Sequence, residues 1–511
     1  IIHTNDTHCG IEENLGFEGV AAYEKQMKAL TPYVTLVDAG DAIQGAPVGT
    51  LSEGGYIISL MNQAGYDFAI PGNHEFDYGM SRFLKLSTTL DCGYYSCNLV
   101  KGPSKQLVFK PYKIINYDDV SVAYVGVTTP ESITKSNPTN FQNGTGGYIY
   151  SLCEDADGQS LYRQVQDAVD AARSEGANFV ILVGHLGNEG VTEKWTSKSV
   201  IANTNGIDAV IDGHSHETFT ERVPNKDGAL VPLAQTGTKF ANIGKITITP
   251  SKEIRLELVD AVTAQDGTAA SDPEMKDLIT RIKSQYEASL KTVLGHTDVK
   301  LTSTNPDTNL RAVRNAETNL GDFCADAFRV LLGTDIGIMN GGGIRGSIDA
   351  GDITYEDALN VYPFGNMICA VEATGQQIKD ALEMGVSLYP EESGGFIHAS
   401  GLTYTIDSSI PSSVRTDERR NFTGVAGEYR VKDILVNGEP IDLEKTYTVA
   451  SHNYWLKSGG DGMSMFVNCP VVRDDVMVDV DTITTYIQDH LGGVVGEEYG
   501  NPHGQGRITI K

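Results

Sequence analysis

Residues 68–75 read Phe-Ala-Ile-Pro-Gly-Asn-His-Glu, an apolar run followed at once by glycine and three side chains that can bind metal or move protons. The arrangement recurs elsewhere: Ile1-Ile2 precede Asp6 and His8, Val34–Val37 precede Gly40-Asp41, Phe179–Val183 precede Gly184-His185, and Ala209–Ile211 precede Gly213 to His216. In open α/β sheets, the loops at the carboxyl ends of strands form the ligand crevice. We therefore expect these five segments to converge on one site.

The rest of the chain extends this pattern into two domains. Its first half alternates short apolar runs with turns and amphipathic stretches, which is typical of a layered α/β fold. Residues 272–294 begin with Asp-Pro and carry apolar residues at helical spacing, so they predict a helix between domains. A further helix and a strand then lead into Asn340–Ile348, which is rich in glycine. We expect a catalytic domain at 1–265, a linker helix at 266–296 and a second domain at 297–511.

Composition excludes several classes of protein. The chain has 511 residues and a net charge of −28, and so acidic a surface repels phosphate backbones, so we expect no nucleic-acid polymer as partner. Its seven cysteines are odd in number and contain no C-x-x-C pair, so they indicate neither a zinc ribbon nor a disulfide framework. No apolar run approaches the roughly 18 residues of a membrane helix, so we expect no transmembrane segment in this chain. The numbering starts without Met inside an apolar run, which is consistent with the removal of a leader segment.

The donor types at the five segments indicate a metal centre. They supply aspartate, asparagine and histidine without sulfur, a set that suits Zn, Mn, Fe or Co better than Ca or Mg. One ion would use three or four of these donors and leave the others as buried polar groups, at about 1–3 kcal/mol each if unpaired. We therefore expect two divalent ions that share one carboxylate. Such a pair would activate water for attack on phosphorus without a protein nucleophile.

Five ordered blocks resemble the calcineurin-like metallophosphoesterases: D-x-H at Asp6, G-D at Gly40, G-N-H-E at Gly72, G-H at Gly184 and G-H-x-H at Gly213. Within that superfamily, nearly the whole chain resembles the two-domain 5′-nucleotidases through NDTH, DAGDAIQG, GNHEFDYG, DGHSHE and QTGTKFANIGKI. The resemblance implies an N-terminal four-layer α/β/β/α metallophosphoesterase sandwich and a C-terminal α/β 5′-nucleotidase substrate domain.

The resemblance also implies roles for individual residues of the first domain. His74, oriented by Asp77, would stabilise the transferring phosphoryl oxygens, and Glu75 would support the site without acting chemically. Asn73 belongs to the same catalytic group and is also a ligand. The implied ligands are Asp6, His8, Asp41 and His216 for one ion, and Asp41, Asn73, His185 and His214 for the other.

Arginines stand out in the second domain, because a guanidinium fork suits phosphate in so acidic a chain. By the resemblance, Arg314, Asn340 and Arg345 contact substrate phosphate and sugar, and Asp461 accepts from ribose hydroxyls. Phe364, beside Asn366 in the same substrate-binding segment, would stack on the base opposite an aromatic near Trp455. The family usually has phenylalanine at Trp455, so either Tyr454 or Trp455 is the second ring.

The leading interpretation is a two-metal 5′-nucleotidase that acts on nucleoside monophosphates, with nucleoside di- and triphosphates or nucleotide sugars as further substrates. The alternatives are a 2′,3′-cyclic-nucleotide phosphodiesterase with 3′-nucleotidase activity, and a catalytically silent nucleotide-binding or adhesive surface protein. The resemblance implies an extracytoplasmic location: secreted, periplasmic or at the cell surface. The sequence leaves the oligomeric state open.

Overall fold

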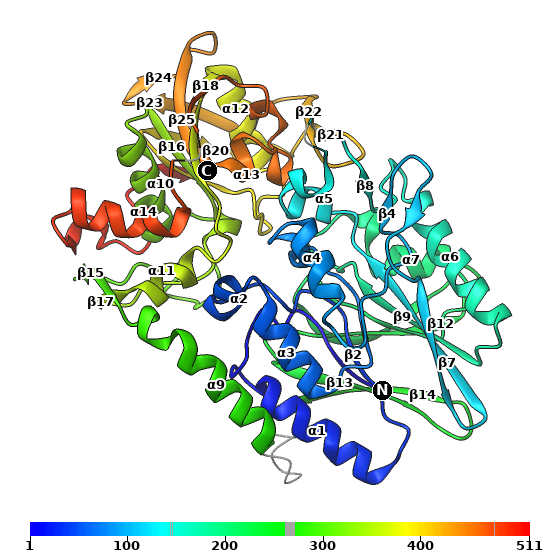
Figure 1. The fold of residues 1–511 in the computed structure, drawn as a ribbon. Coiled ribbons are helices and arrows are strands. Elements are labelled where there is room, and N and C mark those ends of the chain that lie inside the picture. The colour runs from blue at the N-terminus through cyan, green and yellow to red at the C-terminus, as the bar shows by residue number, and fades with distance from the viewer. Residues whose placement is uncertain (144, 146, 261–270, 475) are drawn as a thin grey trace. The chain divides into compact units, whose positions relative to one another are not determined.

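The computed structural model describes residues 1–143, 145, 147–260, 271–474 and 476–511. These form two compact units, Ile1–Gln285 and Tyr286–Lys511, which we describe one at a time (Figure 1). The expected domain boundary between residues 265 and 266 lies outside the described residues. Helix α9 (Pro273–Leu290) occupies the stretch where the apolar spacing predicts a helix.

The first unit contains two large sheets. One has the strand order β14 (Ile254–Asp260), β13 (Asn242–Ile248), β1 (Ile2–Thr4), β2 (Leu36–Asp38), β3 (Phe68–Ala69). The other has the order β11 (Thr218–Pro224), β12 (Leu230–Thr236), β10 (Ala209–Ile211), β9 (Phe179–His185), β7 (Val120–Thr128), β6 (Tyr112–Tyr117). A small sheet joins β5 (Gln106–Leu107), β4 (Val100–Lys101) and β8 (Tyr150–Ser151).

The central strands of both large sheets run parallel, as their buried apolar runs predict. Strand β2 pairs in parallel with β1 and β3, and β9 pairs in parallel with β7 and β10. The carboxyl ends of neighbouring strands therefore emerge together, in each sheet, at the edge where the ligand-type residues follow. The apolar runs that we expected to form strands are confirmed.

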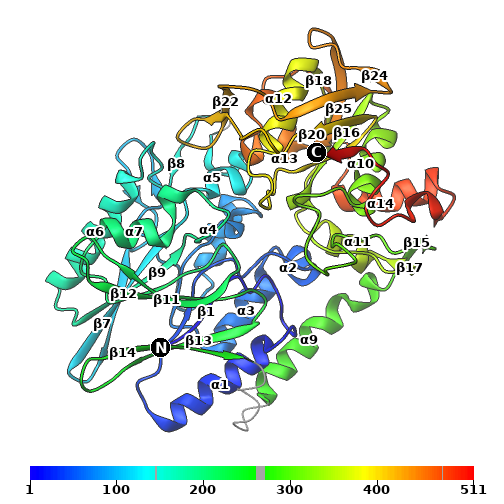
Figure 2. The ribbon, with the colours of Figure 1, turned by 180° about the vertical axis from the view of Figure 1, so that it is seen from behind.

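Packing of the two sheets produces the four layers. Val37 and Phe68 of the first sheet pack against Tyr124 and Ile181 of the second in one buried cluster. Helices α6 (Gln159–Ser174) and α7 (Ser197–Asn203) cover the other face of the second sheet. Helices α1 (Gly16–Leu30) and α3 (Gly55–Ala64) lie along the first sheet (Figure 2). The shorter helices are α2 (Pro47–Ser52), α4 (Met80–Ser87) and α5 (Ser132–Lys135).

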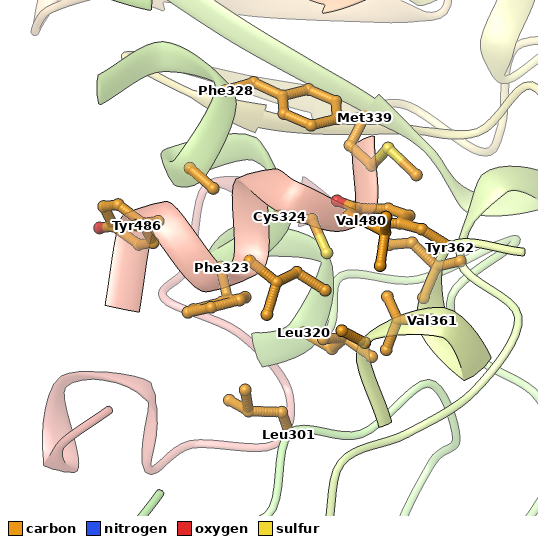
Figure 3. Close-up of a cluster of buried hydrophobic side chains, with 14 of the residues drawn as sticks. Leu301, Leu320, Phe323, Cys324, Phe328, Met339, Val361, Tyr362, Val480 and Tyr486 are labelled. Atoms are coloured by element: carbon orange, nitrogen blue, oxygen red, sulfur yellow. The ribbon is translucent and has the colours of Figure 1, made fainter. Parts of the chain in front are cut away.

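The second unit is built on a sheet with the order β19 (Ile397–Ser400), β16 (Ile336–Asn340), β25 (Thr446–His452), β18 (Ile368–Thr374), β26 (Val471–Arg473). Helix α10 (Asn319–Leu332) begins where the Thr318 hydroxyl accepts from the N–H of Gly321, and it ends at Gly333 in a left-handed conformation. Its apolar face packs Leu320 and Phe323 with Val480 of α14 (Asp479–Thr485) and with Tyr486 (Figure 3).

Smaller elements complete the second unit. Its remaining helices are α11 (Tyr355–Val361), α12 (Gly375–Gly385) and α13 (Asn453–Leu456). Its remaining sheets are β17 (Gly351–Thr354), β15 (Val293–Thr297), β27 (Val494–Val495); then β24 (Glu439–Pro440), β23 (Val431–Val436), β20 (Leu402–Ile406), β28 (Ile508–Ile510); and β21 (Val414–Thr416), β22 (Phe422–Val425). Within the described residues of both units, every helix is too short or too polar to cross a bilayer.

Candidate metal centre and nucleotide site

The ligand-type residues of the first unit gather at the carboxyl ends of its parallel strands. They form two groups whose donor atoms lie within 4.8 Å of one another: Asp6, His8 and His216, and Asp41, His185 and His214. Asp6 and His8 follow β1, Asp41 follows β2, His185 ends β9, and His214 and His216 follow β10. The predicted convergence of these loops is therefore seen in the structure.

Asp41 belongs to the second group and also faces His8 of the first. Its Oδ2 is 3.1 Å from His185 Nε2 and 3.8 Å from His8 Nε2. Its Oδ1 accepts the backbone N–H of His74 at 2.8 Å, which fixes the carboxylate. One carboxylate oxygen thus faces both histidines, as a bridging ligand requires.

The distances within the groups fit metal coordination. His8 Nε2 and His216 Nε2 are 3.0 Å apart, and His216 Nε2 is 3.4 Å from Asp6 Oδ1. Two nitrogens that bind one ion at about 2.1 Å lie roughly 3 Å apart when adjacent in its coordination shell. Among the described residues, the buried Oδ1 of Asn73 has no hydrogen-bond partner, so its amide oxygen is suited to a ligand role. The residues present therefore fit two divalent ions.

The backbone of this centre is strained. Asp6, His8, Asp41, His214 and His216 all adopt positive φ, between 44° and 82°. Residues other than glycine rarely occupy this region, and each instance costs on the order of 1–3 kcal/mol. Such strain concentrates where a site needs side chains aimed in directions that regular structure does not provide.

The electrostatics of the centre are those of closely packed donors. Burial opposes ionisation of Asp6, yet the charges of His216 and His185 lower its pKa to about 2. Burial opposes ionisation of Asp41 too, and His185 and His74 hold its pKa well below the usual range. Burial, then the charge of His216, lowers the pKa of His8 well below its usual value. Burial opposes protonation of His185 too, yet the charges of Asp41 and Asp6 raise its pKa to about 10. These shifts come from buried carboxylates and imidazoles that are packed against one another.

Backbone carbonyls orient two of the ligand histidines. His8 Nδ1 donates to the Gln44 carbonyl at 2.9 Å, and His185 Nδ1 donates to the Ala39 carbonyl at 2.7 Å. Because a carbonyl only accepts, Nδ1 carries a hydrogen in both rings, and Nε2 is the nitrogen that can bind a metal. In both rings Nε2 is the nitrogen that lies near Asp41.

Glu75 ties together two of the ligand loops. Its fully buried carboxylate accepts the backbone N–H groups of Asp41 and Ala42, both at 2.8 Å, and of Gly72 at 2.6 Å. Burial, with the charge of Asp41, raises the pKa of Glu75 to about 7. This supporting position agrees with its expected role.

His74 lies beside the centre without belonging to either group. Its Nδ1 donates to Asp77 Oδ2 at 2.6 Å, and Asp77 Oδ1 accepts from the Ser136 hydroxyl at 2.8 Å. The ring centroid of His74 is 5.3 Å from that of His8. The expected His74–Asp77 pair is therefore formed.

The structure adds Glu131, which sequence reasoning did not single out. Its Oε2 is 3.0 Å from His214 Nε2. Glu131 follows the apolar strand β7, so the rule that located the other residues, a polar side chain after a parallel strand, would also have found it. It was missed because the resemblance carries no motif there.

In the second unit, a glycine loop follows β16. A Cβ on Gly341 would lie 2.0 Å from the Val313 carbonyl oxygen, and one on Gly342 would lie 2.9 Å from Gly394 Cα. Backbone therefore packs directly on backbone, which requires glycine. This packing places Arg314, the neighbour of Val313, beside the loop that begins at Asn340.

Cationic groups gather at this loop. Arg314 is half-buried, and its loss of hydration, followed by the charges of Arg311 and Arg345, lowers its pKa well below the ordinary value. The guanidinium of Arg345 lies 5.7 Å from the ring centroid of Phe364. An anion bound here would relieve the repulsion between the arginines.

Asp461 is held by the residues expected to bind nucleoside. Its Oδ2 accepts from Asn340 Nδ2 at 3.2 Å and from Trp455 Nε1 at 3.1 Å. Its backbone N–H donates to the Tyr454 hydroxyl at 3.1 Å. Asp461 itself adopts a left-handed conformation, with φ of 52°.

Trp455 differs from the stacking ring that the resemblance implies. Its side chain is 0% exposed and belongs to the apolar core that includes Leu456, Met463 and Phe466. A ring enclosed in this way has no face available to a base, whereas Tyr454 is half-buried. The geometry thus argues against Trp455 and favours Tyr454, the alternative that the sequence left open.

The remaining expected substrate residue, Asn366, lies in the loop after Phe364. Its backbone N–H donates to Asp479 Oδ2 at 3.1 Å, and its carbonyl accepts from the Asp479 N–H at 2.8 Å. The start of α14 therefore anchors the loop that carries Phe364 and Asn366.

Comparisons with known proteins identify both parts of the chain. Residues 1–218 match the model of the calcineurin-like phosphoesterases, and residues 293–468 match that of the 5′-nucleotidase C-terminal domain. The trifunctional nucleotide phosphoesterase protein YfkN of Bacillus subtilis is 30% identical over 99% of this chain, which spans 34% of that protein's length. The 5′-nucleotidase of Bos taurus is 28% identical over 95% of this chain and 88% of its own length.

The structural comparison agrees with the sequence relatives. The crystal structure of a 5′-nucleotidase precursor from Thermus thermophilus superposes with a TM-score of 0.79 at 26% identity, covering 100% of this chain and 98% of that one. The chain belongs to the 5′-nucleotidase family, in which a calcineurin-like phosphoesterase domain is followed by a 5′-nucleotidase C-terminal domain.

Proposed function

We propose that this chain is a metal-dependent phosphoric monoester hydrolase that releases phosphate from nucleoside 5′-monophosphates. The observation that carries the proposal is the pair of Asp–His groups that meet at Asp41, with the His74–Asp77 pair beside them. The 5′-nucleotidases among the relatives support the substrate class.

The proposed centre binds two divalent ions. Asp6, His8, Asp41 and His216 hold one, and Asp41, Asn73, His185 and His214 hold the other. The nitrogen and oxygen donors favour Zn, Mn, Fe or Co. Ions bound there would stabilise the charge on the phosphoryl group and lower the pKa of the attacking water.

His74 is the proposed catalytic side chain that is not a ligand. Asp77 accepts the hydrogen of His74 Nδ1 and so holds the imidazole in one orientation. We assign His74 Nε2 to a hydrogen bond with a phosphoryl or leaving-group oxygen. A positioned acid of this kind typically contributes 10²- to 10⁴-fold to the rate.

We assign nucleotide recognition to the second unit. Arg314 and Arg345 supply positive charge for phosphate, and Asn340 and Asp461 supply polar contacts to the sugar. Phe364 and Tyr454 provide ring faces for the base, with Asn366 in the same loop. Trp455 donates to Asp461 and thereby orients it.

A second candidate is a 2′,3′-cyclic-nucleotide phosphodiesterase with 3′-nucleotidase activity. The observation that favours it is the 30% identity to a protein named as a trifunctional nucleotide phosphoesterase. The proposed metal and arginine sites would serve either reaction, because both transfer a phosphoryl group to water.

We also propose that the chain works outside the cytoplasm, as the family resemblance implies. Fractionation of the source cells, with activity and antibody detection in each fraction, tests this. Recovery of the protein with cytoplasmic markers would contradict it.

A substrate panel tests the proposed activity. Phosphate release is measured from 5′-AMP, 3′-AMP, 2′,3′-cyclic AMP and ATP, and UDP-glucose is followed by a coupled assay, since its first cleavage frees no orthophosphate. The proposal predicts the highest kcat/KM for 5′-AMP and loss of this activity with EDTA. A preference for the cyclic or 3′ substrate favours the second candidate, and no turnover on any substrate contradicts both.

A further inference from the structure

Glu131 makes a contact that distinguishes His214 from the other ligand histidines. Its side chain is 4% exposed, and Oε2 lies 3.0 Å from His214 Nε2. An ionised carboxylate only accepts hydrogen bonds, so His214 carries its hydrogen on Nε2 and its lone pair on Nδ1. His8 and His185 have the reverse arrangement, because backbone carbonyls hold their Nδ1 hydrogens.

The second oxygen of Glu131 is also committed. Oε1 accepts the backbone N–H of Thr192 at 2.8 Å and the Thr192 hydroxyl. Thr192 lies between β9 and α7, so Glu131 joins that loop to the loop that follows β10. Both oxygens face donors, and this leaves the carboxylate one orientation.

The loop of His214 is fixed from its other side as well. The backbone N–H of His214 donates to Asp6 Oδ2 at 3.0 Å. Asp6 therefore fixes the backbone at His214, and Glu131 fixes the imidazole ring of His214. The ring's remaining nitrogen, Nδ1, is the one available to the group formed with Asp41 and His185.

We propose that Glu131 is a positioning residue that holds His214 in the tautomer whose Nδ1 binds metal, and that it strengthens the second ion site selectively. The inference rests on the two-metal centre of the proposed function. Partners of this kind around a ligand histidine typically alter metal affinity 10- to 100-fold.

Glu131→Gln keeps the size of the side chain and changes only the hydrogen bonds that it can make. Thr192 N–H and His214 Nε2–H both need an acceptor, and a carboxylate serves both, whereas an amide offers one oxygen and one NH₂ group. If the amide oxygen stays on Thr192, the NH₂ group faces His214 and favours the tautomer with hydrogen on Nδ1. That tautomer cannot bind a metal through Nδ1.

The test is metal binding by the full chain, with Mn²⁺ or Zn²⁺ as the probe. Wild-type protein, Glu131→Gln and Glu131→Asp are titrated by calorimetry, and bound metal is counted by elemental analysis after equilibration in metal buffers. Glu154→Gln is the matched control, since Glu154 Oε2 likewise accepts from a backbone N–H and a hydroxyl, of Leu152 and Ser151. Circular dichroism checks that each variant is folded.

We expect Glu131→Gln to keep the affinity of the site that contains His8 and His216. The affinity of the site that contains His214 is expected to fall about 10- to 100-fold. Glu131→Asp keeps the charge and recovers part of the loss, and Glu154→Gln matches wild type. If Glu131→Gln does not fold, Thr192→Val removes one donor to Oε1 and is expected to weaken the same ion several-fold.

Two unchanged affinities in Glu131→Gln, or in Thr192→Val where that variant replaces it, would overturn this inference and leave the proposed function intact. Equal weakening of both ions would also overturn it, because the effect would not be selective for the second site. A wild-type protein that binds fewer than two ions would instead contradict the metal centre of the proposed function, and with it this inference.

Discussion

His74 carries the sharpest claim at the scale of single residues. Its Nδ1 is bonded to Asp77, and it belongs to neither ligand group, so His74→Ala is expected to retain both ions and to lose about 10²- to 10⁴-fold in kcat. Elemental analysis and steady-state kinetics measure the two effects. His296→Ala, an exposed histidine of the second unit, is the control and is expected to match wild type. Metal loss in His74→Ala would make His74 a ligand.

Tyr454 and Trp455 make a second comparison of single residues. Stacking on a base is worth about 1–3 kcal/mol, so Tyr454→Ala is expected to raise KM for 5′-AMP by about 5- to 150-fold with little change in kcat. Tyr454→Phe keeps the ring and is expected to stay much closer to wild type. A normal KM in Tyr454→Ala would contradict the assignment of the base contact to Tyr454.

At the scale of secondary-structure elements, the sequence predicts which site residues follow a strand but not how their side chains pack. The ligand loops were predictable because each follows an apolar strand, and parallel strands deliver their carboxyl ends to one edge. The burial of Trp455 was not predictable, because the sequence of two adjacent aromatic residues does not indicate which of the two rings is buried in the core. Glu131 follows the parallel strand β7, so the same rule places it at this edge, but its pairing with His214, 83 residues away, comes only from the arrangement of β7, β9 and β10.

The start of α14 carries a pH-dependent prediction at this scale. Burial raises the pKa of Asp479 from 3.8 to about 8. Between these values the folded state holds a proton that the unfolded state has released, so rising pH lowers stability, with a slope of up to about 1.4 kcal/mol per pH unit. Asp479→Asn mimics the protonated carboxyl and is expected to remove this contribution.

Urea unfolding between pH 5 and pH 8 measures the difference. The free energy of unfolding of wild type is expected to fall relative to Asp479→Asn as pH rises. Asp489→Asn, at an exposed position ten residues further along the chain, is the control and is expected to follow wild type. Parallel curves for wild type and Asp479→Asn would show that Asp479 is ionised in the fold.

The whole molecule has a net charge of −28, and this bears on substrate size. An acidic surface repels a polyanion far more than a single nucleotide, whose phosphate is met locally by arginines. We expect 5′-AMP to be hydrolysed with a kcat/KM at least about 100-fold above that of a 5′-phosphorylated 20-mer DNA at low salt. Comparable values would contradict the proposed restriction to small nucleotides.

The most direct test of the central claim is to add metal back to the metal-free protein while counting bound ions and measuring turnover of 5′-AMP in the same samples. Two ions that meet at Asp41 predict that activity rises with occupancy of the second site and reaches its plateau at two ions per chain. Full activity at one ion per chain, or hydrolysis that persists with no metal bound, would contradict the account.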